Sequence, residues 1–152
     1  MKIKVKDKVV GISHAERGRT MIQDFVNRFM EHKDELESVF AKAHPESYYA
    51  IVKAVVSLIA NTYEEQGYGQ PDPDRIHAID DGEYQGTLLF VIAAREYQPS
   101  DYWYVRVAYG SCSGCDTLES IREYDDDPPS AEQVKDYMEL ALHIVQGLKA
   151  LG

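Results

Sequence analysis

The sequence predicts an α+β fold: a single domain in which a small antiparallel β-meander packs against a layer of helices. Helical apolar periodicity dominates the first 60 residues, strand-like segments follow, and a helical pattern returns at the end of the chain. A length of 152 residues fits one domain over residues 1–152. A chain of this size buries about two-thirds of its unfolded surface, so it needs no disulfide or metal to fold.

The N-terminal part is predicted to form a short strand and two helices. Residues 2–10 alternate apolar and lysine side chains, as an edge strand with one polar face does. Apolar residues then recur at three- and four-residue steps over residues 14–43, and Thr20 with Gln23 fits a capping box, which places the start of the regular helix near residue 20. Residues 45–64 are apolar on nearly every side, which predicts a central, buried helix.

The middle of the chain is predicted to form an antiparallel meander of about three strands. A loop rich in glycine and proline, residues 66–74, precedes it. Residues 75–80 and 84–95 are strand candidates, and a short loop leads to a third strand over residues 102–109. The apolar face of this third strand consists of Trp103, Val105, Val107 and Tyr109.

Two further helices are predicted to close the chain. Residues 117–124 form a short one, which three aspartates and two prolines end. Ser130 and Gln133 then give a second capping-box signature, followed by a long apolar stripe that ends at Leu148. The carboxylates of residues 123–127 lack the spacing of an EF-hand loop, which favours a solvated turn over a Ca²⁺ site.

The charge is unevenly distributed along the sequence. Residues 1–60 carry 10 Lys and Arg against 8 Asp and Glu, whereas residues 61–152 carry 6 against 18. This balance argues against direct nucleic-acid binding, which needs basic surface. It indicates either an ordinary acidic surface or a face that meets a basic partner protein. The longest apolar run, residues 48–60, is too short to span a bilayer and no signal peptide is visible, so we expect a cytoplasmic protein without membrane contacts.

One stretch has the character of a functional site: residues 109–118, Y-G-S-C-S-G-C-D-T-L. We expect it to connect a strand to a helix, with glycines shaping the turn and Asp116 or Thr117 capping the helix. The unpaired backbone N–H groups of such a turn can hold an anion or another ligand. The candidate binding residues are Tyr109, Gly110, Ser111, Ser113, Gly114 and Asp116, together with the acidic turn residues Asp125, Asp126 and Asp127.

The two cysteines, Cys112 and Cys115, allow three further interpretations. A C-x-x-C pair at a helix start can activate a thiol, which would make the protein a thiol–disulfide oxidoreductase. The same pair could supply half of a structural zinc site, although no second C-x-x-C is present. The simplest interpretation is that the cysteines pack as small hydrophobic residues. The sequence contains neither H-E-x-x-H nor G-x-S-x-G, and we assign no catalytic residue and no cofactor.

The segments Y-Q-G-T-L-L-F-V-I (84–92) and W-Y-V-R-V-A-Y-G-S-C-S-G-C-D-T-L (103–118) resemble a group of small, largely uncharacterised proteins of bacteriophages and prophages. The resemblance covers roughly a quarter of the chain and brings no functional residues with it. It implies a phage accessory protein that binds a host or phage protein. We therefore expect a non-enzymatic acidic interaction protein, such as an inhibitor that occupies a basic, nucleic-acid-binding surface. Self-association is a further option, and the thiol and zinc hypotheses are alternatives.

Overall fold

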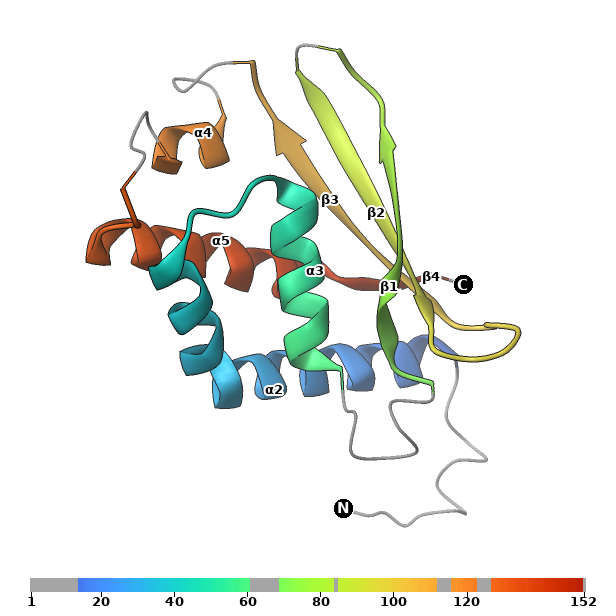
Figure 1. The fold of residues 1–152 in the computed structure, drawn as a ribbon. Coiled ribbons are helices and arrows are strands. Elements are labelled where there is room, and N and C mark those ends of the chain that lie inside the picture. The colour runs from blue at the N-terminus through green and yellow to red at the C-terminus, as the bar shows by residue number, and fades with distance from the viewer. Residues whose placement is uncertain (1–13, 61–68, 84, 112–115, 123–126, 152) are drawn as a thin grey trace.

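A layer of helices covers one face of a four-stranded antiparallel sheet (Figure 1). This computed structural model describes residues 14–60, 69–83, 85–111, 116–122 and 127–151. The α+β class predicted from the sequence is confirmed. The strand expected at residues 2–10 lies outside the described residues.

The sheet has the strand order β1-β2-β3-β4, and every neighbouring pair is antiparallel. The first three strands are β1 (Pro71–Asp80), β2 (Gly86–Ala94) and β3 (Tyr102–Tyr109), which confirms the predicted meander. The prediction of a loop over residues 66–74 is wrong from residue 71 onward, where β1 begins. An edge strand tolerates proline, and the register shift between Pro71 and Ile76 accommodates the irregular start of β1.

The fourth strand, β4 (Lys149–Leu151), was not predicted. It has only three residues, which is too short for a hydrophobic period to show. It forms because the chain leaves the last helix beside β3, where Tyr102–Tyr104 offer a free edge for pairing. The C-terminal end of the described chain is thereby tied into the sheet.

The helices are α2 (His14–Lys42), α3 (Tyr48–Ile59), α4 (Thr117–Arg122) and α5 (Ala131–Gly147). The expected helix start near residue 20 is wrong, because α2 already begins at His14. A capping-box signature therefore does not by itself fix a helix start when helical residues precede it.

The capping box predicted at the last helix is present in α5. The Ser130 hydroxyl oxygen accepts a hydrogen bond from the Gln133 N–H at 3.1 Å, and the Gln133 side-chain oxygen accepts one from the Ser130 N–H at 2.8 Å. Two N–H groups without partners inside the helix are thereby satisfied. In α3, Ser47 caps the first turn and accepts a hydrogen bond from the Ala50 N–H at 3.1 Å.

The core lies between the sheet and the helices, with α3 at its centre, as the sequence predicted. Trp103 of β3 meets Phe25 of α2 edge-on, with ring centroids 5.7 Å apart. Removing such apolar surface from water supplies the main favourable term for folding. The buried residues of α3 are Tyr48, Ile51, Val52, Val55, Val56 and Ile59.

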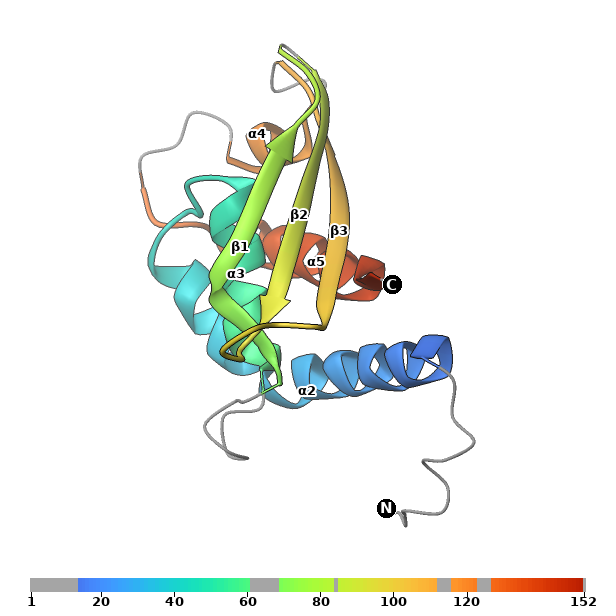
Figure 2. The ribbon, with the colours of Figure 1, turned by 90° about the vertical axis from the view of Figure 1, so that its right-hand side faces the viewer.

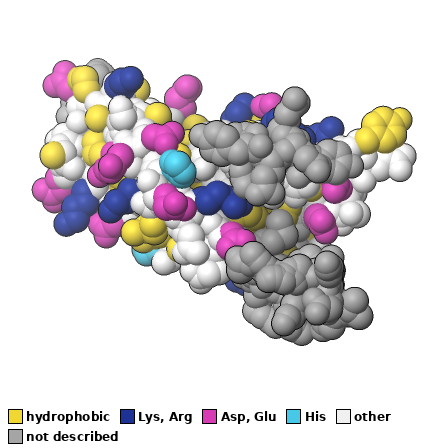
Figure 3. Space-filling model, turned by 90° about the horizontal axis from the view of Figure 1, so that it is seen from below, with side chains coloured by type: hydrophobic (Ala, Val, Ile, Leu, Met, Phe, Trp, Pro, Cys, Tyr) yellow, Lys and Arg dark blue, Asp and Glu magenta, His cyan; other side chains and the backbone are white. Residues whose placement is uncertain are grey.

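The other face of the sheet carries no helix in the described part of the chain (Figure 2). The lower face of the molecule, along α2, carries acidic and basic side chains with isolated hydrophobic side chains between them (Figure 3). Among the described helices, none combines the length and the apolar character that a membrane span needs.

Candidate functional site

A surface hollow of about 320 Å³ lies at the end of the sheet where β1 and β3 finish, beside the start of α3 and the short helix α4. This corner is at the top of Figure 1. We call it the acidic hollow, because four carboxylate side chains take part in its lining. Its apolar wall includes Tyr48, Tyr49, Leu88, Phe90 and Tyr109, and its carboxylates are Glu46, Asp80, Asp116 and Glu119.

Asp116 holds the strand-to-helix connection in place from inside the protein. Its side chain is buried, and one carboxylate oxygen accepts hydrogen bonds from the Tyr48 hydroxyl at 3.0 Å and the Gly110 N–H at 2.9 Å. The other oxygen accepts the Glu119 N–H at 2.9 Å, which is N-cap geometry for α4. The predicted capping role of Asp116 is confirmed, and it extends to a link between α3, β3 and α4.

Tyr48 completes this network on the side of α3. Its hydroxyl oxygen accepts a hydrogen bond from the Leu118 N–H at 3.0 Å while its proton is donated to Asp116. Burial of the phenol, with the nearby Asp116 carboxylate adding to the effect, raises the pKa of Tyr48 to about 12. The hydroxyl therefore stays protonated and keeps donating at any physiological pH.

A second tyrosine–carboxylate pair lies at the rim of the hollow. The Tyr109 hydroxyl donates to Asp80 at 2.6 Å, and the Gly82 N–H donates to the same oxygen at 3.0 Å. The bond to Asp80 raises the pKa of Tyr109 to about 12, and the same bond lowers the pKa of Asp80. Asp80 thus remains ionised and fixed at the rim.

The lining is strongly unbalanced in charge. Among its described residues, Arg122 is the one basic side chain against the four carboxylates. Arg122 donates to the Glu46 carbonyl oxygen at 3.3 Å and lies 4.0 Å from the Glu119 carboxylate. This single cation leaves the hollow with a net negative charge beside an apolar wall.

The structure places only part of the predicted site at the hollow. Tyr109, Gly110 and Asp116 line it, and Ser111 is exposed next to it. Asp127 does not line it; its carbonyl oxygen instead accepts a hydrogen bond from His44 Nε2 at 2.9 Å. The remaining predicted residues lie outside the described part of the chain: Cys112, Ser113, Gly114, Cys115, Asp125 and Asp126.

The sequence analysis missed the lining residues that lie outside residues 109–127: Glu46, Ser47, Tyr48, Tyr49, Ala78, Asp80, Leu88 and Phe90. They come from three separate regions of the sequence, and only the fold brings them together. The thiol and zinc hypotheses rest on the two cysteines, which lie outside the described residues, so both stay predictions.

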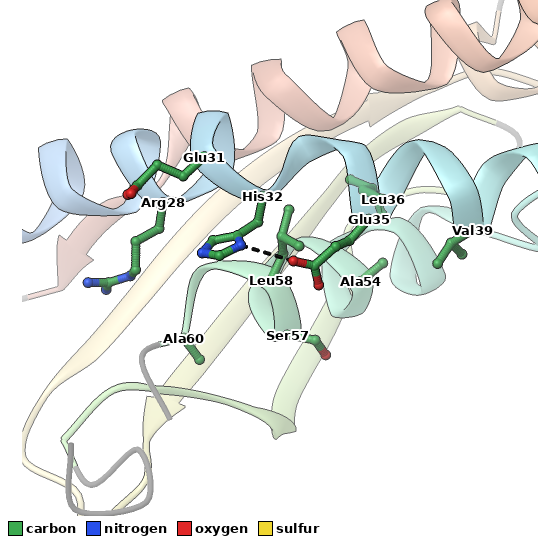
Figure 4. Close-up of a pocket in the computed structure, with 10 residues that line it drawn as sticks. All are labelled: Arg28, Glu31, His32, Glu35, Leu36, Val39, Ala54, Ser57, Leu58 and Ala60. Carbon is green, nitrogen blue, oxygen red and sulfur yellow. Dashed lines mark hydrogen bonds and ion pairs between the residues drawn. The ribbon is translucent and has the colours of Figure 1, made fainter. Parts of the chain in front are cut away.

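A larger cavity, of about 510 Å³, lies between α2 and α3 (Figure 4). His32 and Glu35 bridge one helical turn there, with 2.9 Å between Nδ1 and Oε2. The Ser57 hydroxyl donates to a backbone carbonyl oxygen of its own helix at 2.8 Å, and the Arg28 guanidinium donates to the Ile59 carbonyl oxygen. These four polar residues thus make contacts within the protein, and no sequence motif marks the cavity.

The described side chains of the site can be compared with what metal binding and proton transfer require. Within the part of the chain that the structure describes, no three His, Cys, Asp or Glu side chains gather as metal ligands would. At the acidic hollow, the buried carboxylate accepts from three donors that hold the protein together. Such a saturated group positions its neighbours instead of accepting a proton from a substrate.

Comparisons with protein-family models, with curated proteins and with solved structures found no match to this chain.

Proposed function

We propose that the protein is a non-enzymatic acidic interaction protein of the phage or prophage type, which binds a basic surface of a host protein through the acidic hollow. The observation that carries this proposal is the combination of an apolar, tyrosine-rich wall with carboxylates at one corner of the molecule. The formal net charge of −10 favours the same class of partner.

The two kinds of surface in the hollow match the two parts of an arginine or lysine side chain. The aliphatic stem of such a side chain packs on apolar surface while its charged head stays at the edge. Tyr49, which is 39% exposed, offers an aromatic face, and the side chains of Asp80 and Glu119 offer acceptors. A basic residue of a partner would therefore be recognised along its whole length.

The hollow is held in shape before any partner arrives. Asp116 fixes Gly110 and the start of α4, and the Tyr109–Asp80 bond fixes the rim. These side chains therefore lose little conformational entropy when a partner binds. A smaller loss of entropy gives a higher affinity for the same contact area.

A basic protein surface that binds nucleic acid is the partner class that we favour. Such a surface presents arginine and lysine side chains to phosphates, and a carboxylate-bearing surface competes for the same cations. Occupying it would make the protein an inhibitor of nucleic-acid binding. The interaction should weaken as the salt concentration rises, because exposed charges are screened.

The proposal is tested by affinity capture from a bacterial lysate on the immobilised protein. The wild type should retain a basic protein and prevent that protein from binding an oligonucleotide. The Asp80→Asn/Glu119→Gln double variant should retain at least tenfold less of it, because two rim carboxylates lose their charge. A triple change of Asp125, Asp126 and Asp127 to Asn measures how much of the capture depends on the acidic turn.

The matched control is Glu132→Gln/Glu139→Gln, which removes the same charge from two exposed positions of α5. This control should capture the partner as the wild type does. Equal capture by the hollow variant and the wild type would contradict the proposed site. Equal losses of capture in both double variants would show that net charge alone explains the binding, which would also contradict the site.

A further inference from the structure

The face of the sheet that no described helix covers has an apolar centre (Figure 2). Side chains along a strand alternate between the two faces, and Phe90, Ile92 and Trp103 define the buried face. The positions next to them along the strands therefore point away from the helices. We call the following six residues the open sheet face: Ile79, Leu89, Val91, Tyr102, Tyr104 and Arg106.

The open sheet face lies in a part of the chain that is free of negative charge. The chain holds 26 Asp and Glu, yet β2, β3 and β4 contain none at any position. Arg106 is exposed directly across from Leu89, and Lys149 of β4 lies across from Tyr104. A cationic and apolar surface in a chain of net charge −10 is complementary in charge to an acidic partner.

Arg106 differs from the other arginines in its contacts. Among the arginines whose side chains the structure describes, each of the others donates a hydrogen bond to an oxygen atom of the protein. Within that set, Arg106 alone makes neither a hydrogen bond nor an ion pair with the protein, and its guanidinium lies over the Tyr104 ring, 5.7 Å from the centroid. Its N–H donors are therefore left for solvent or for a carboxylate of a partner.

We propose that the open sheet face binds an amphipathic helix of an acidic partner protein, with a carboxylate of that helix paired to Arg106. A helix must bury its apolar stripe, and a sheet face is one of the surfaces on which it does so. Leu89 and Val91 lie under the centre of this stripe, and Ile79 and Tyr104 flank them on the neighbouring strands. An Asp or Glu at the border of the stripe then reaches the guanidinium that the Tyr104 ring positions.

Single-stranded nucleic acid is the competing occupant, since tyrosines stack on bases and cations bind phosphates. Ile79, Leu89 and Val91 offer no aromatic surface for a base, and Arg106 with Lys149 allows little counterion release. A second copy of the chain would bring a further net charge of −10 and, at this face, an arginine in place of a carboxylate. The observations therefore favour an acidic and apolar protein segment.

Fluorescence anisotropy with two synthetic peptides tests the proposal on the full chain. Both peptides are amphipathic helices of about 18 residues with the same leucine stripe, and one carries Glu beside the stripe where the other carries Gln. The wild type should bind the Glu peptide about tenfold more tightly than the Gln peptide, because a charge-assisted pair with a guanidinium contributes that much. Net charge alone predicts the opposite order, since a chain of charge −10 repels the Glu peptide.

Two variants of the face separate its charged and apolar contributions. Arg106→Gln should remove the preference for the Glu peptide, and Ile79→Asp should weaken the binding of both peptides about tenfold, because it places a charge under the apolar stripe. Arg106 is exposed and Ile79 is 46% exposed, so both variants should fold, which circular dichroism checks. The matched control is Lys33→Gln, which removes one positive charge from an exposed position of α2 and should keep the preference.

Failure of the wild type to bind the Glu peptide, or a preference that Arg106→Gln leaves unchanged, would overturn the proposal. The same loss of preference in Lys33→Gln would also overturn it, because net charge would then explain the effect. A single-stranded oligonucleotide that binds the wild type and not Arg106→Gln would overturn it in favour of nucleic acid.

Discussion

At the scale of single residues, Asp116 does the most to determine the shape of the candidate site. It is one of two polar residues found buried in the described part of the chain, and its carboxylate accepts three hydrogen bonds. A buried charge of this kind is tolerated because donors from three elements surround it. The sequence indicated a cap at this position, whereas the link to Tyr48 requires residues 68 positions apart to meet.

Replacing Asp116 by Ala should lower the free energy of unfolding by about 3 kcal/mol, since three donors lose a charged acceptor in a buried place. Urea denaturation followed by circular dichroism measures this change. Asp34→Ala, at an exposed position of α2, is the control and should change the free energy by less than about 0.5 kcal/mol. Equal denaturation midpoints for the Asp116 variant and the wild type would show that the network contributes nothing.

Tyrosine ionisation gives the fold a pH dependence at the alkaline end. Tyr48, Tyr109 and Tyr137 each have a pKa raised to about 12, the first and last chiefly by burial and Tyr109 by its bond to Asp80. An unfolded tyrosine ionises near pH 10. Between about pH 10 and pH 12, the folded chain therefore binds more protons than the unfolded chain. Stability from these residues is complete below about pH 10 and is lost as the pH rises through about 12.

A spectrophotometric titration of phenolate absorbance tests this prediction. Phenolate absorbance should keep rising to about pH 12 as Tyr48, Tyr109 and Tyr137 ionise, and Tyr48→Phe should remove one of these late-ionising phenols. A single transition near pH 10 in the native protein would contradict the assignment.

At the scale of elements, patterns that repeat over several turns were read correctly. The apolar stripe and capping box of α5, the buried character of α3 and the alternation in β3 all predict the structure that forms. These signals are local, since each depends on side-chain spacing within one segment. The start of β1 and the existence of β4 depend instead on pairing with strands distant in sequence. A local side-chain pattern gives no sign of such pairing.

The candidate site divides in the same way. Tyr109, Gly110 and Asp116 were predicted from the glycine-punctuated turn, and they line the hollow. Asp80 and Glu46 joined them only through the fold, because β1 and the start of α3 converge at the end of β3. The turn motif thus predicted which corner of the molecule holds the candidate site. The other residues that line the hollow could be identified only from the tertiary structure.

At the scale of the whole molecule, the described surface divides into regions of different character. One corner is acidic and hollowed, whereas the face of the sheet that no described helix covers carries Leu89, Val91, Tyr102 and Tyr104. The proposed function uses the acidic corner, where carboxylates and apolar side chains lie together.

The most direct test of the central claim is an NMR titration of the isotope-labelled protein with a capped arginine-rich peptide. If the acidic hollow holds basic side chains, the largest shifts should fall on the backbone amides of Gly110, Leu118 and Glu119, and Asp80→Asn/Glu119→Gln should remove them. Glu132→Gln/Glu139→Gln should leave them in place. Shifts spread evenly over α2 and α5, or unchanged in the hollow variant, would contradict the claim.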